Sequence, residues 1–275
     1  MNIYNFDPRS KFKMEKPIIT LTTDWGMRDF YTGAVKGKLL SKMPHAQVVD
    51  ISHQIAPHDI IHASFVLKNA FPQFPGGTIH LIGVDNNTTY EQPHALIKTQ
   101  GQYFIGTDNG IFSLMFRQKP ETIIHIDMHQ ESDYFTFPVR DLFCKVAAGL
   151  IQGKAPEYFG NEANKIRELQ AFQPVILNNT IKAKVIHVDR YKNLITNISR
   201  DTFQQVGKGK PFVIHFHGGR FNIMHINTEY NEVNEAEIVA IFGSSGFLEI
   251  ALNKGKASDL LGMDLDSPVI LEFQK

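Results

Sequence analysis

The first half of the chain alternates short runs of β-branched apolar residues with stretches of helical periodicity, and this alternation constrains the fold most strongly. Residues 17–23, 47–51 and 78–84 are predicted to be buried strands, because β-branched side chains suit a packed, pleated surface. Residues 30–43 and 59–71 carry apolar side chains at helical spacing and lie between those strands. This order predicts an α/β domain with a parallel sheet and right-handed crossovers.

Further along, the pattern changes to shorter elements. Residues 94–99 and 102–105 predict a hairpin around Gly101, and residues 140–151 predict an amphipathic helix with Cys144 on its apolar side, where we expect an inert buried thiol. After a polar stretch, short strands alternate with glycine-containing turns and no long helix is apparent. That pattern is typical of a small all-β domain, a barrel or a sandwich.

The length of 275 residues suits two domains. We expect a flexible N-terminal extension at residues 1–16, an α/β domain at residues 17–160 and a smaller β-rich domain at residues 174–275. The polar stretch between the two domains contains prolines and a glycine, which are common in linkers.

Charge and cysteine content exclude several classes of protein. The 28 Lys+Arg residues balance 28 Asp+Glu residues, so no basic excess is available for nucleic acid or an anionic membrane. The single cysteine cannot form an intrachain disulfide, and no run approaches the 18 apolar residues of a membrane span. Residues 1–16 lack the apolar core of a signal peptide. We expect a cytoplasmic protein without nucleic-acid or membrane partners.

Three predicted parallel strands each end in an aspartate: Asp24, Asp50 and Asp85. Ligands of open α/β sheets bind beyond the carboxyl ends of the strands. A single aspartate in such a place commonly caps a turn, but three in succession favour a shared site. Because an ionised carboxylate only accepts hydrogen bonds, the site would suit a cation, a metal or ribose hydroxyls.

Six short segments carry a more specific signal. They are Thr23-Asp24-Trp25-Gly26, Asp29-Phe30-Tyr31-Thr32-Gly33, Val49-Asp50-Ile51-Ser52-His53, Thr107-Asp108-Asn109-Gly110, Asp189-Arg190-Tyr191-Lys192-Asn193 with Thr196-Asn197, and Ser244-Ser245-Gly246-Phe247-Leu248-Glu249-Ile250-Ala251. In this order, from about residue 18 to the C-terminus, they resemble the S-adenosyl-L-methionine hydroxide adenosyltransferases, relatives of fluorinase and chlorinase.

The resemblance implies a homotrimer that binds a nucleoside between the N-terminal domain of one subunit and the C-terminal domain of its neighbour. It implies that Asp24 holds the ribose hydroxyls, and that Asp189 and Asn193 contact the methionine part and the adenine. Ser244 and Ser245 match the last binding loop.

Aromatic residues lie close to these positions in the sequence. Phe30 and Tyr31 follow the Asp24 turn and are candidates for the wall of the nucleoside pocket, and Tyr191 belongs to the same candidate binding set. Trp25 could stack on a ligand or fill the subunit interface, and the sequence leaves both open.

The reaction implied by the resemblance is attack of water on C5′ of S-adenosylmethionine, which gives adenosine and methionine without a cofactor. Methionine leaves as a neutral thioether, so no general acid is required and positioning of the nucleophile dominates. Some group must still take the proton of the attacking water. In the water-using members an Asp–Arg–His set handles this water.

The chain departs from that set in two of its three positions. Asp85 matches the aspartate, but Gln92 falls where the family pattern has arginine and Pro138 where it has histidine. His94 lies two residues past Gln92, and we hypothesise that His94 and Asp85 support weak hydrolysis. The alternative is a protein that binds S-adenosylmethionine or adenosine without turnover.

Two further histidines, His125 and His129, precede the altered Pro138 segment and are additional candidates for the missing base. Which of these histidines acts is left open by the sequence.

A second cluster could in principle hold a metal. Asp50, His53, His58, Asp59 and His62 lie within thirteen residues, and His58 and His62 have the i,i+4 spacing of zinc ligands on a helix. The family resemblance already accounts for two of these residues and its chemistry uses no metal. We therefore predict no metal site here.

Overall fold

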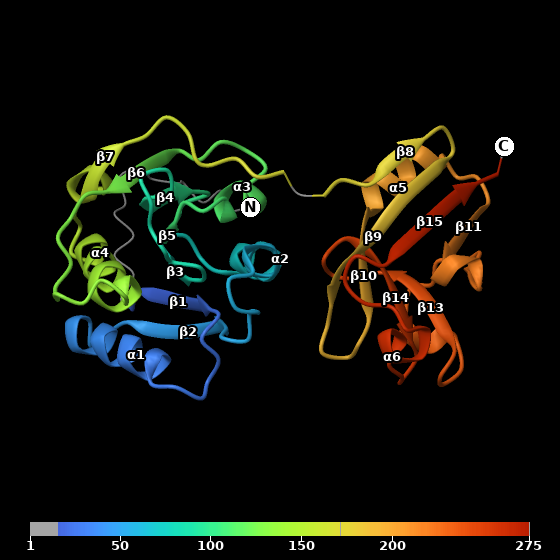
Figure 1. Ribbon diagram of the computed structural model, residues 1–275, viewed down its shortest axis with the longest axis horizontal. Coiled ribbons are helices and arrows are strands. Elements are labelled where there is room, and N and C mark those ends of the chain that lie inside the picture. The colour runs from blue at the N-terminus through green and yellow to red at the C-terminus, as the bar shows by residue number, and fades with distance from the viewer. Residues whose placement is uncertain (1–15, 171, 275) are drawn as a thin grey trace, which may run out of the picture. The chain divides into compact units, whose positions relative to one another are not determined.

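The computed structural model describes residues 16–170 and 172–274, so the extension predicted at residues 1–16 lies, apart from Lys16, outside the described residues. The chain divides into two compact units, residues 1–170 and 171–275 (Figure 1). The first unit continues beyond residue 160, where the backbone N–H of Arg167 donates to the Asp108 carboxylate at 2.9 Å.

Within the described residues, the first unit is built on a seven-stranded sheet with the order β2-β1-β3-β5-β4-β6-β7. Its strands are β1 (Ile18–Thr23), β2 (Gln47–Ser52), β3 (Ile79–Gly83), β4 (His94–Thr99), β5 (Gln102–Thr107), β6 (Thr122–Ile126) and β7 (Gly160–Glu162). The pairs β1–β2, β1–β3 and β3–β5 are parallel, which confirms the predicted parallel α/β core.

The other half of this sheet is antiparallel, because β4 and β5 form the predicted hairpin. Its two-residue turn places Gln100 at φ +51° and Gly101 at φ +71°. Two consecutive positive φ angles match the twist of a tight hairpin, and a tight hairpin can join only antiparallel strands.

Helices cover both faces of the sheet. They are α1 (Tyr31–Lys42), α2 (Ile60–Ala70), α3 (Ile111–Met115) and α4 (Cys144–Ile151), with the short turns η1 (Phe71–Gln73) and η3 (Pro156–Phe159) and the π-helical turn η2 (Val139–Phe143). Helices α1 and α4 pack in one apolar core with Leu81, and α2 and α3 pack in another with Ile82. Consecutive residues of β3 therefore serve opposite faces, as strand geometry requires.

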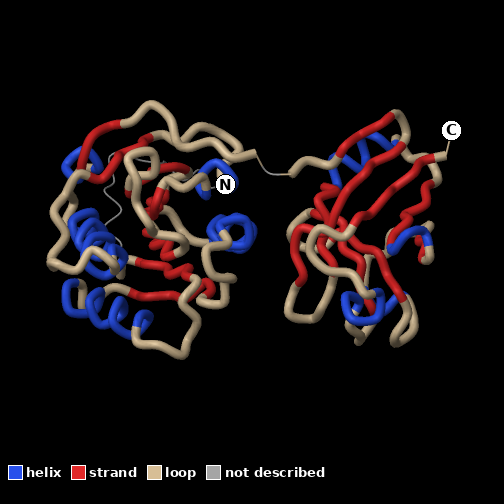
Figure 2. The backbone as a smooth tube through the Cα atoms, viewed as in Figure 1, coloured by secondary structure: helices blue, strands red, loops and turns tan. Residues whose placement is uncertain are grey.

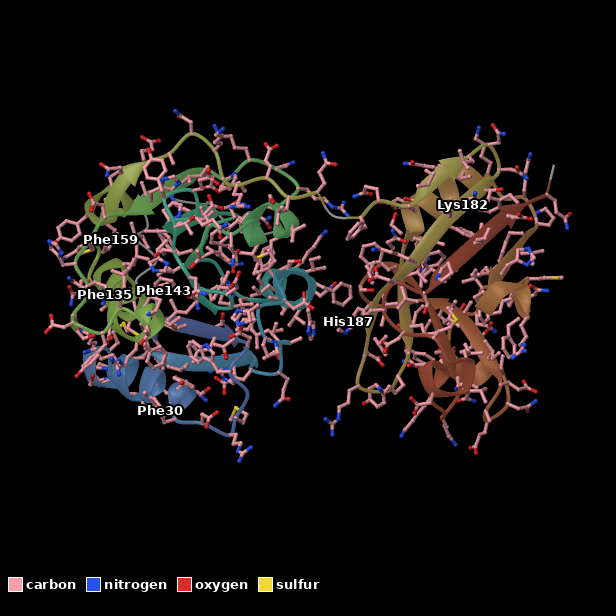
Figure 3. All side chains as sticks on the ribbon, viewed as in Figure 1. Phe30, Phe135, Phe143, Phe159, Lys182 and His187 are labelled. Carbon is pink, nitrogen blue, oxygen red and sulfur yellow. The ribbon has the colours of Figure 1, made fainter. Side chains whose placement is uncertain are left out.

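The sequence-predicted helix at 140–151 begins one residue earlier and starts as the π-helical turn η2. Phe143 and Phe159, both labelled in Figure 3, are fully buried beside α4. Cys144 is fully buried in the same core, as predicted, and burial raises the pKa of its thiol to about 12. This thiol is inert at neutral pH.

The second unit is β-rich, as predicted (Figure 2). Its strands are β8 (Val175–Leu177), β9 (Thr180–Val188), β10 (Leu194–Ser199), β11 (Phe212–Phe216), β12 (Phe221–Ile223), β13 (Ile238–Phe242), β14 (Phe247–Leu252) and β15 (Pro268–Phe273), with the helices α5 (Arg200–Gly207) and α6 (Ala257–Leu261) and the turns η4 (His217–Gly219) and η5 (Tyr230–Glu232). All its strand pairs within the described residues are antiparallel, and the barrel-like sheet surrounds one core that includes Ile214, Leu248 and Val269.

Candidate active site

A cavity of about 510 Å³ opens in the first unit beyond the carboxyl ends of β1 and β3. It is lined by Asp24, Trp25, Tyr31, Pro57, His58, Asp85, Asn86, Asn87, Thr88, His94, Phe135, Thr136, Phe137, Pro138 and Val139. Its position is the one at which open α/β sheets bind ligands. Its volume suits a small molecule.

The Asp24 carboxylate joins the loops that follow three strands. Its Oδ2 accepts the backbone N–H of His58 at 2.9 Å and that of Asp85 at 3.4 Å. Both residues have positive φ angles, +63° and +47°, which are unfavourable for residues other than glycine. Asp24 therefore holds two strained turns, and its Oδ1 has no hydrogen-bond partner among the described residues.

The Asp85 carboxylate contacts the His58 imidazole, with 3.1 Å between Asp85 Oδ1 and His58 Nδ1. Asn109 also stabilises this turn, because its Nδ2 donates to the backbone oxygen of Asp85 at 3.0 Å. The i,i+4 spacing of His58 and His62 suggested that both lie on one helix, and for His58 this placement is wrong. Helix α2 begins at Ile60 with Asp59 as its N-cap, so His58 lies in the preceding loop.

Asp50 does not share the cavity, which corrects the expectation of three clustered carboxylates. Strand β2 continues to Ser52, so Asp50 remains within the sheet instead of ending the strand. Its carboxylate contacts Lys36 of α1 at 2.5 Å and lies 3.1 Å from His53 Nε2 without hydrogen-bond alignment. Among the described residues, no group of three or more His, Cys, Asp or Glu side chains is placed to hold a metal ion.

His94 lines the cavity, but its nearest polar partner is not Asp85. Its Nδ1 lies 3.1 Å from Thr107 Oγ1, and its ring meets the edge of Phe143 with 4.9 Å between centroids. Burial lowers the pKa of His94 to about 4, so the imidazole is neutral at pH 7.

The remaining candidates for handling water lie outside the lining of this cavity. Gln92 forms a tight turn with Thr89, whose carbonyl accepts the Gln92 N–H at 3.1 Å. His125 and His129 are likewise absent from the lining, whereas Pro138 forms part of the wall.

Aromatic rings form one side of the cavity. Trp25 meets Phe137 edge-on at 5.3 Å between centroids, and Tyr31 meets the same ring at 5.4 Å. Trp25 is therefore a wall residue of this cavity, and its stacking on a ligand there stays a prediction. Phe30 is not in the lining: it is 66 % exposed and packs on the outer side of Tyr31 at 4.5 Å.

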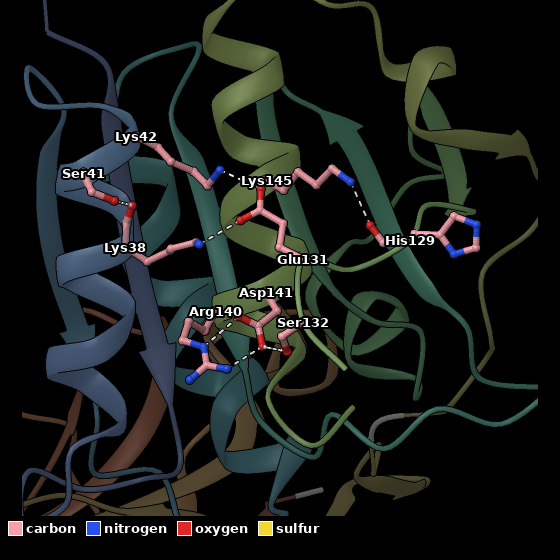
Figure 4. Close-up of polar contacts among 9 residues, drawn as sticks. All are labelled: Lys38, Ser41, Lys42, His129, Glu131, Ser132, Arg140, Asp141 and Lys145. Carbon is pink, nitrogen blue, oxygen red and sulfur yellow. Dashed lines mark hydrogen bonds and ion pairs between the residues drawn. The ribbon is translucent and has the colours of Figure 1, made fainter. Parts of the chain in front are cut away.

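Charged groups stabilise residues 131–141, which contain the cavity-lining residues 135–139 and lie beside helix α1 (Figure 4). Lys38 and Lys42 of α1 both contact Glu131, at 2.8 and 2.6 Å. The Arg140 guanidinium donates two hydrogen bonds to the Asp141 carboxylate, at 2.7 and 2.6 Å. These interactions hold the Asp141 pKa below its usual range, because the Arg140 hydrogen bonds favour the carboxylate. These pairs are not predictable from the sequence, since their members are far apart along the chain or are adjacent charges.

The second unit carries the other sequence-predicted binding residues in two separate turns. Asp189 and Asn193 are brought together, because the backbone N–H and Nδ2 of Asn193 donate to the two Asp189 oxygens at 2.9 and 3.1 Å. Tyr191 in the same turn is 75 % exposed. Ser244 and Ser245 lie in the turn between β13 and β14.

These two turns lie at opposite ends of β10. The strand register pairs Leu194, next to the first turn, with Ile250, and pairs Ser199 with Phe247, next to the second turn. A six-residue strand separates its ends by roughly 20 Å.

The Glu249 side chain of β14 lies between the two turns: a Cβ at Gly243 would lie 2.7 Å from Glu249 Oε2. Burial, and after it the charge of Asp189, raises the pKa of Glu249, so this carboxylate is also close to the first turn.

Comparisons with known proteins identify the family of this chain. Residues 19–160 match the family described as SAM hydroxide adenosyltransferase N-terminal domain, and residues 183–270 match the corresponding C-terminal domain. The chain belongs to the S-adenosyl-L-methionine hydroxide adenosyltransferase family.

Individual relatives carry a specific activity in their names. A protein named (R)-S-adenosyl-L-methionine hydrolase from Methanocaldococcus jannaschii is 32% identical, covering 90% of this chain and 92% of its own length. A protein of the same name from Thermus thermophilus is 30% identical, over 93% of this chain and 99% of the relative. A solved structure, an uncharacterized conserved protein from Thermotoga maritima, has a TM-score of 0.82 at 30% identity, covering 92% of this chain and 99% of that one.

Proposed function

We propose that this chain hydrolyses S-adenosylmethionine to adenosine and L-methionine by attack of water on C5′. The observation that carries the proposal is the meeting of Asp24 and Asp85 in one aromatic-walled cavity of the first unit. The relatives named (R)-S-adenosyl-L-methionine hydrolase support the same activity, because they match nearly the whole chain.

The cavity suits the charge of this substrate. The chain has a formal net charge of zero, so a cationic sulfonium must be attracted by local carboxylates rather than by the overall field. Asp24 and Asp85 supply that local negative charge, and Trp25 and Tyr31 supply aromatic faces that attract cations and stack on bases. The free Oδ1 of Asp24 is available to accept ribose hydroxyls.

An assay of products tests the proposal. Incubation of the purified protein with S-adenosylmethionine should release adenosine and methionine in equal amounts. The Asp85→Asn variant should lose most of this activity while it keeps the left-handed backbone that asparagine tolerates at this position. Substrate that remains intact after prolonged incubation with the wild-type protein would rule the proposal out.

A second candidate function is binding without turnover. Gln92 and Pro138 favour it, because they stand where the family pattern has arginine and histidine, and neither can orient a hydroxide as a cation and an imidazole would. Calorimetric titration with S-adenosylmethionine separates the two. If the heat per injection falls to zero at saturation and the S-adenosylmethionine in the cell stays intact, the protein binds without turnover. If heat continues to be released after saturation and adenosine accumulates, the protein hydrolyses S-adenosylmethionine.

The remaining parts of the proposal follow from the family resemblance. We propose a homotrimer in which Asp189, Asn193 and the second unit of a neighbouring copy complete the site. Light scattering of the purified protein tests the trimer. No cofactor and no nucleic acid takes part in the proposed reaction, and a cytoplasmic location is supported by the single, buried Cys144. Among the described residues, no helix is long and apolar enough to cross a bilayer.

A further inference from the structure

We propose that His58 is the base of the reaction and takes the place of the histidine that this chain lacks at Pro138. This inference rests on the proposed hydrolysis. His58 Nδ1 faces Asp85 Oδ1 at 3.1 Å, and both residues line the same cavity. A carboxylate that accepts from one ring nitrogen leaves the other nitrogen free to accept a proton, which is the arrangement of a carboxylate–imidazole base.

The exposure of the pair fits this role. The His58 side chain is 71% exposed and that of Asp85 is 33% exposed. Among the described residues, no group forms a hydrogen bond or an ion pair with His58 Nε2, whereas Nδ1 is engaged by the carboxylate. With Nδ1–H donating to Asp85, Nε2 carries a lone pair and is accessible to water.

The backbone holds the imidazole in place. The backbone N–H of His58 donates to the Asp24 carboxylate at 2.9 Å, and the backbone carbonyl of His58 accepts the N–H of Ile60 at 3.1 Å. Pro57 precedes it and Asp59 caps helix α2 directly after it. The same aspartate that is expected to hold the ribose thus fixes the position of the base, which favours a defined attack geometry.

The proposed step balances in atoms and charge. The oxygen of water forms a bond to C5′, the C5′–S bond breaks, and its electron pair leaves with sulfur as neutral methionine. The water proton moves to His58 Nε2, and the resulting imidazolium is stabilised by the Asp85 carboxylate. The products are adenosine, methionine and a proton, which His58 returns to solvent through its exposed edge.

The other histidines considered from the sequence fit less well. His94 is held by Thr107, and its pKa of about 4 makes it a weak proton acceptor near neutral pH. His125 and His129 do not line the cavity. The earlier pairing of Asp85 with His94 is therefore replaced by the contact with His58.

The test compares three variants with the wild-type protein. His58→Asn keeps a residue that tolerates φ +63° but removes the base, and its kcat should fall by about 10²–10⁴-fold. His58→Gly also accepts this backbone angle, and added imidazole should restore part of its kcat because the position is open to solvent. His129→Asn is the matched control: its ring is exposed and points away from the ion-pair cluster in Figure 4, so its kcat should not change.

A binding measurement distinguishes a variant that lacks only the base from a variant that does not fold. The fluorescence of Trp25, the single tryptophan and a wall residue, should report S-adenosylmethionine binding within about 3-fold of wild type in His58→Asn. A variant that binds and hydrolyses like the wild type would overturn the role of His58 while leaving the proposed function intact. A wild-type protein that produces no adenosine would instead refute the proposed function itself.

Discussion

Replacing Gly83 with alanine tests whether the aromatic wall is packed as the structure describes. Gly83 is the last residue of β3, and an added Cβ would lie 2.7 Å from Trp25 Cζ2 and 2.9 Å from Thr23 Cγ2. Ordinary carbon contacts begin near 3.4 Å, so a shift of roughly half an ångström or more is required. Thr23 is fully buried in β1, and the indole therefore has to move.

The expected cost of this overpacking is about 1–3 kcal/mol in the free energy of unfolding. Gly37→Ala is the matched control, because a Cβ at Gly37 meets nothing within 4 Å in the middle of helix α1. There the same chemical change should stabilise the protein by up to about 1 kcal/mol, since alanine favours a helix over glycine. The two substitutions therefore have opposite predicted signs.

Urea unfolding followed by circular dichroism and by tryptophan emission measures both variants. Because Trp25 is the only tryptophan, its emission reports directly on the cavity wall. Gly83→Ala should unfold at lower urea, shift the emission of the folded protein and weaken binding of S-adenosylmethionine. Unchanged stability together with an unchanged spectrum would show that Trp25 does not pack over Gly83, and the description of the wall would be wrong.

Three further predictions concern charged and titratable groups. Asp24→Ala should weaken nucleoside binding at least ~10-fold, because it removes the oxygen expected to accept the ribose hydroxyls. The substitution also removes the acceptor of the backbone N–H groups of His58 and Asp85. Unchanged affinity by calorimetry would contradict this prediction. Asp141→Asn should cost about 1.5–3 kcal/mol at pH 7 by urea unfolding. Because its folded pKa is depressed, this contribution is present above the unfolded value of ~3.9 and is lost as pH falls through the folded pKa, so variant and wild-type stabilities should converge in acid. Burial lowers the pKa of His94 to about 4, so wild-type stability should fall as pH drops from ~6.5 toward that value, and His94→Gln should remove this part of the pH dependence.

The sequence predicts the local elements of the fold well because their causes are local. The β-branched runs become β1, β2 and β3, and the Asp59 cap starts helix α2 as its position after Pro57 suggests. The antiparallel half of the first sheet depends on the hairpin turn, and Gly101 already indicated that turn.

The candidate site is only partly predictable, because it depends on where strands end and on contacts between distant loops. Asp24 and Asp85 meet as expected, but Asp50 does not, since β2 continues two residues past Asp50, to Ser52. His58 was visible in the sequence, yet its contact with Asp85 joins residues 27 positions apart. The loop after β2 ends in the same crevice as those after β1 and β3, and this topology is the signal that could have identified His58.

Hydrolysis in water enriched in ¹⁸O tests the central claim most directly. Attack at C5′ predicts one ¹⁸O atom in the 5′-hydroxyl of the released adenosine and none in methionine, as measured by mass spectrometry. Unlabelled adenosine, label in a fragment of the methionine side chain, or substrate that stays intact would each contradict the account.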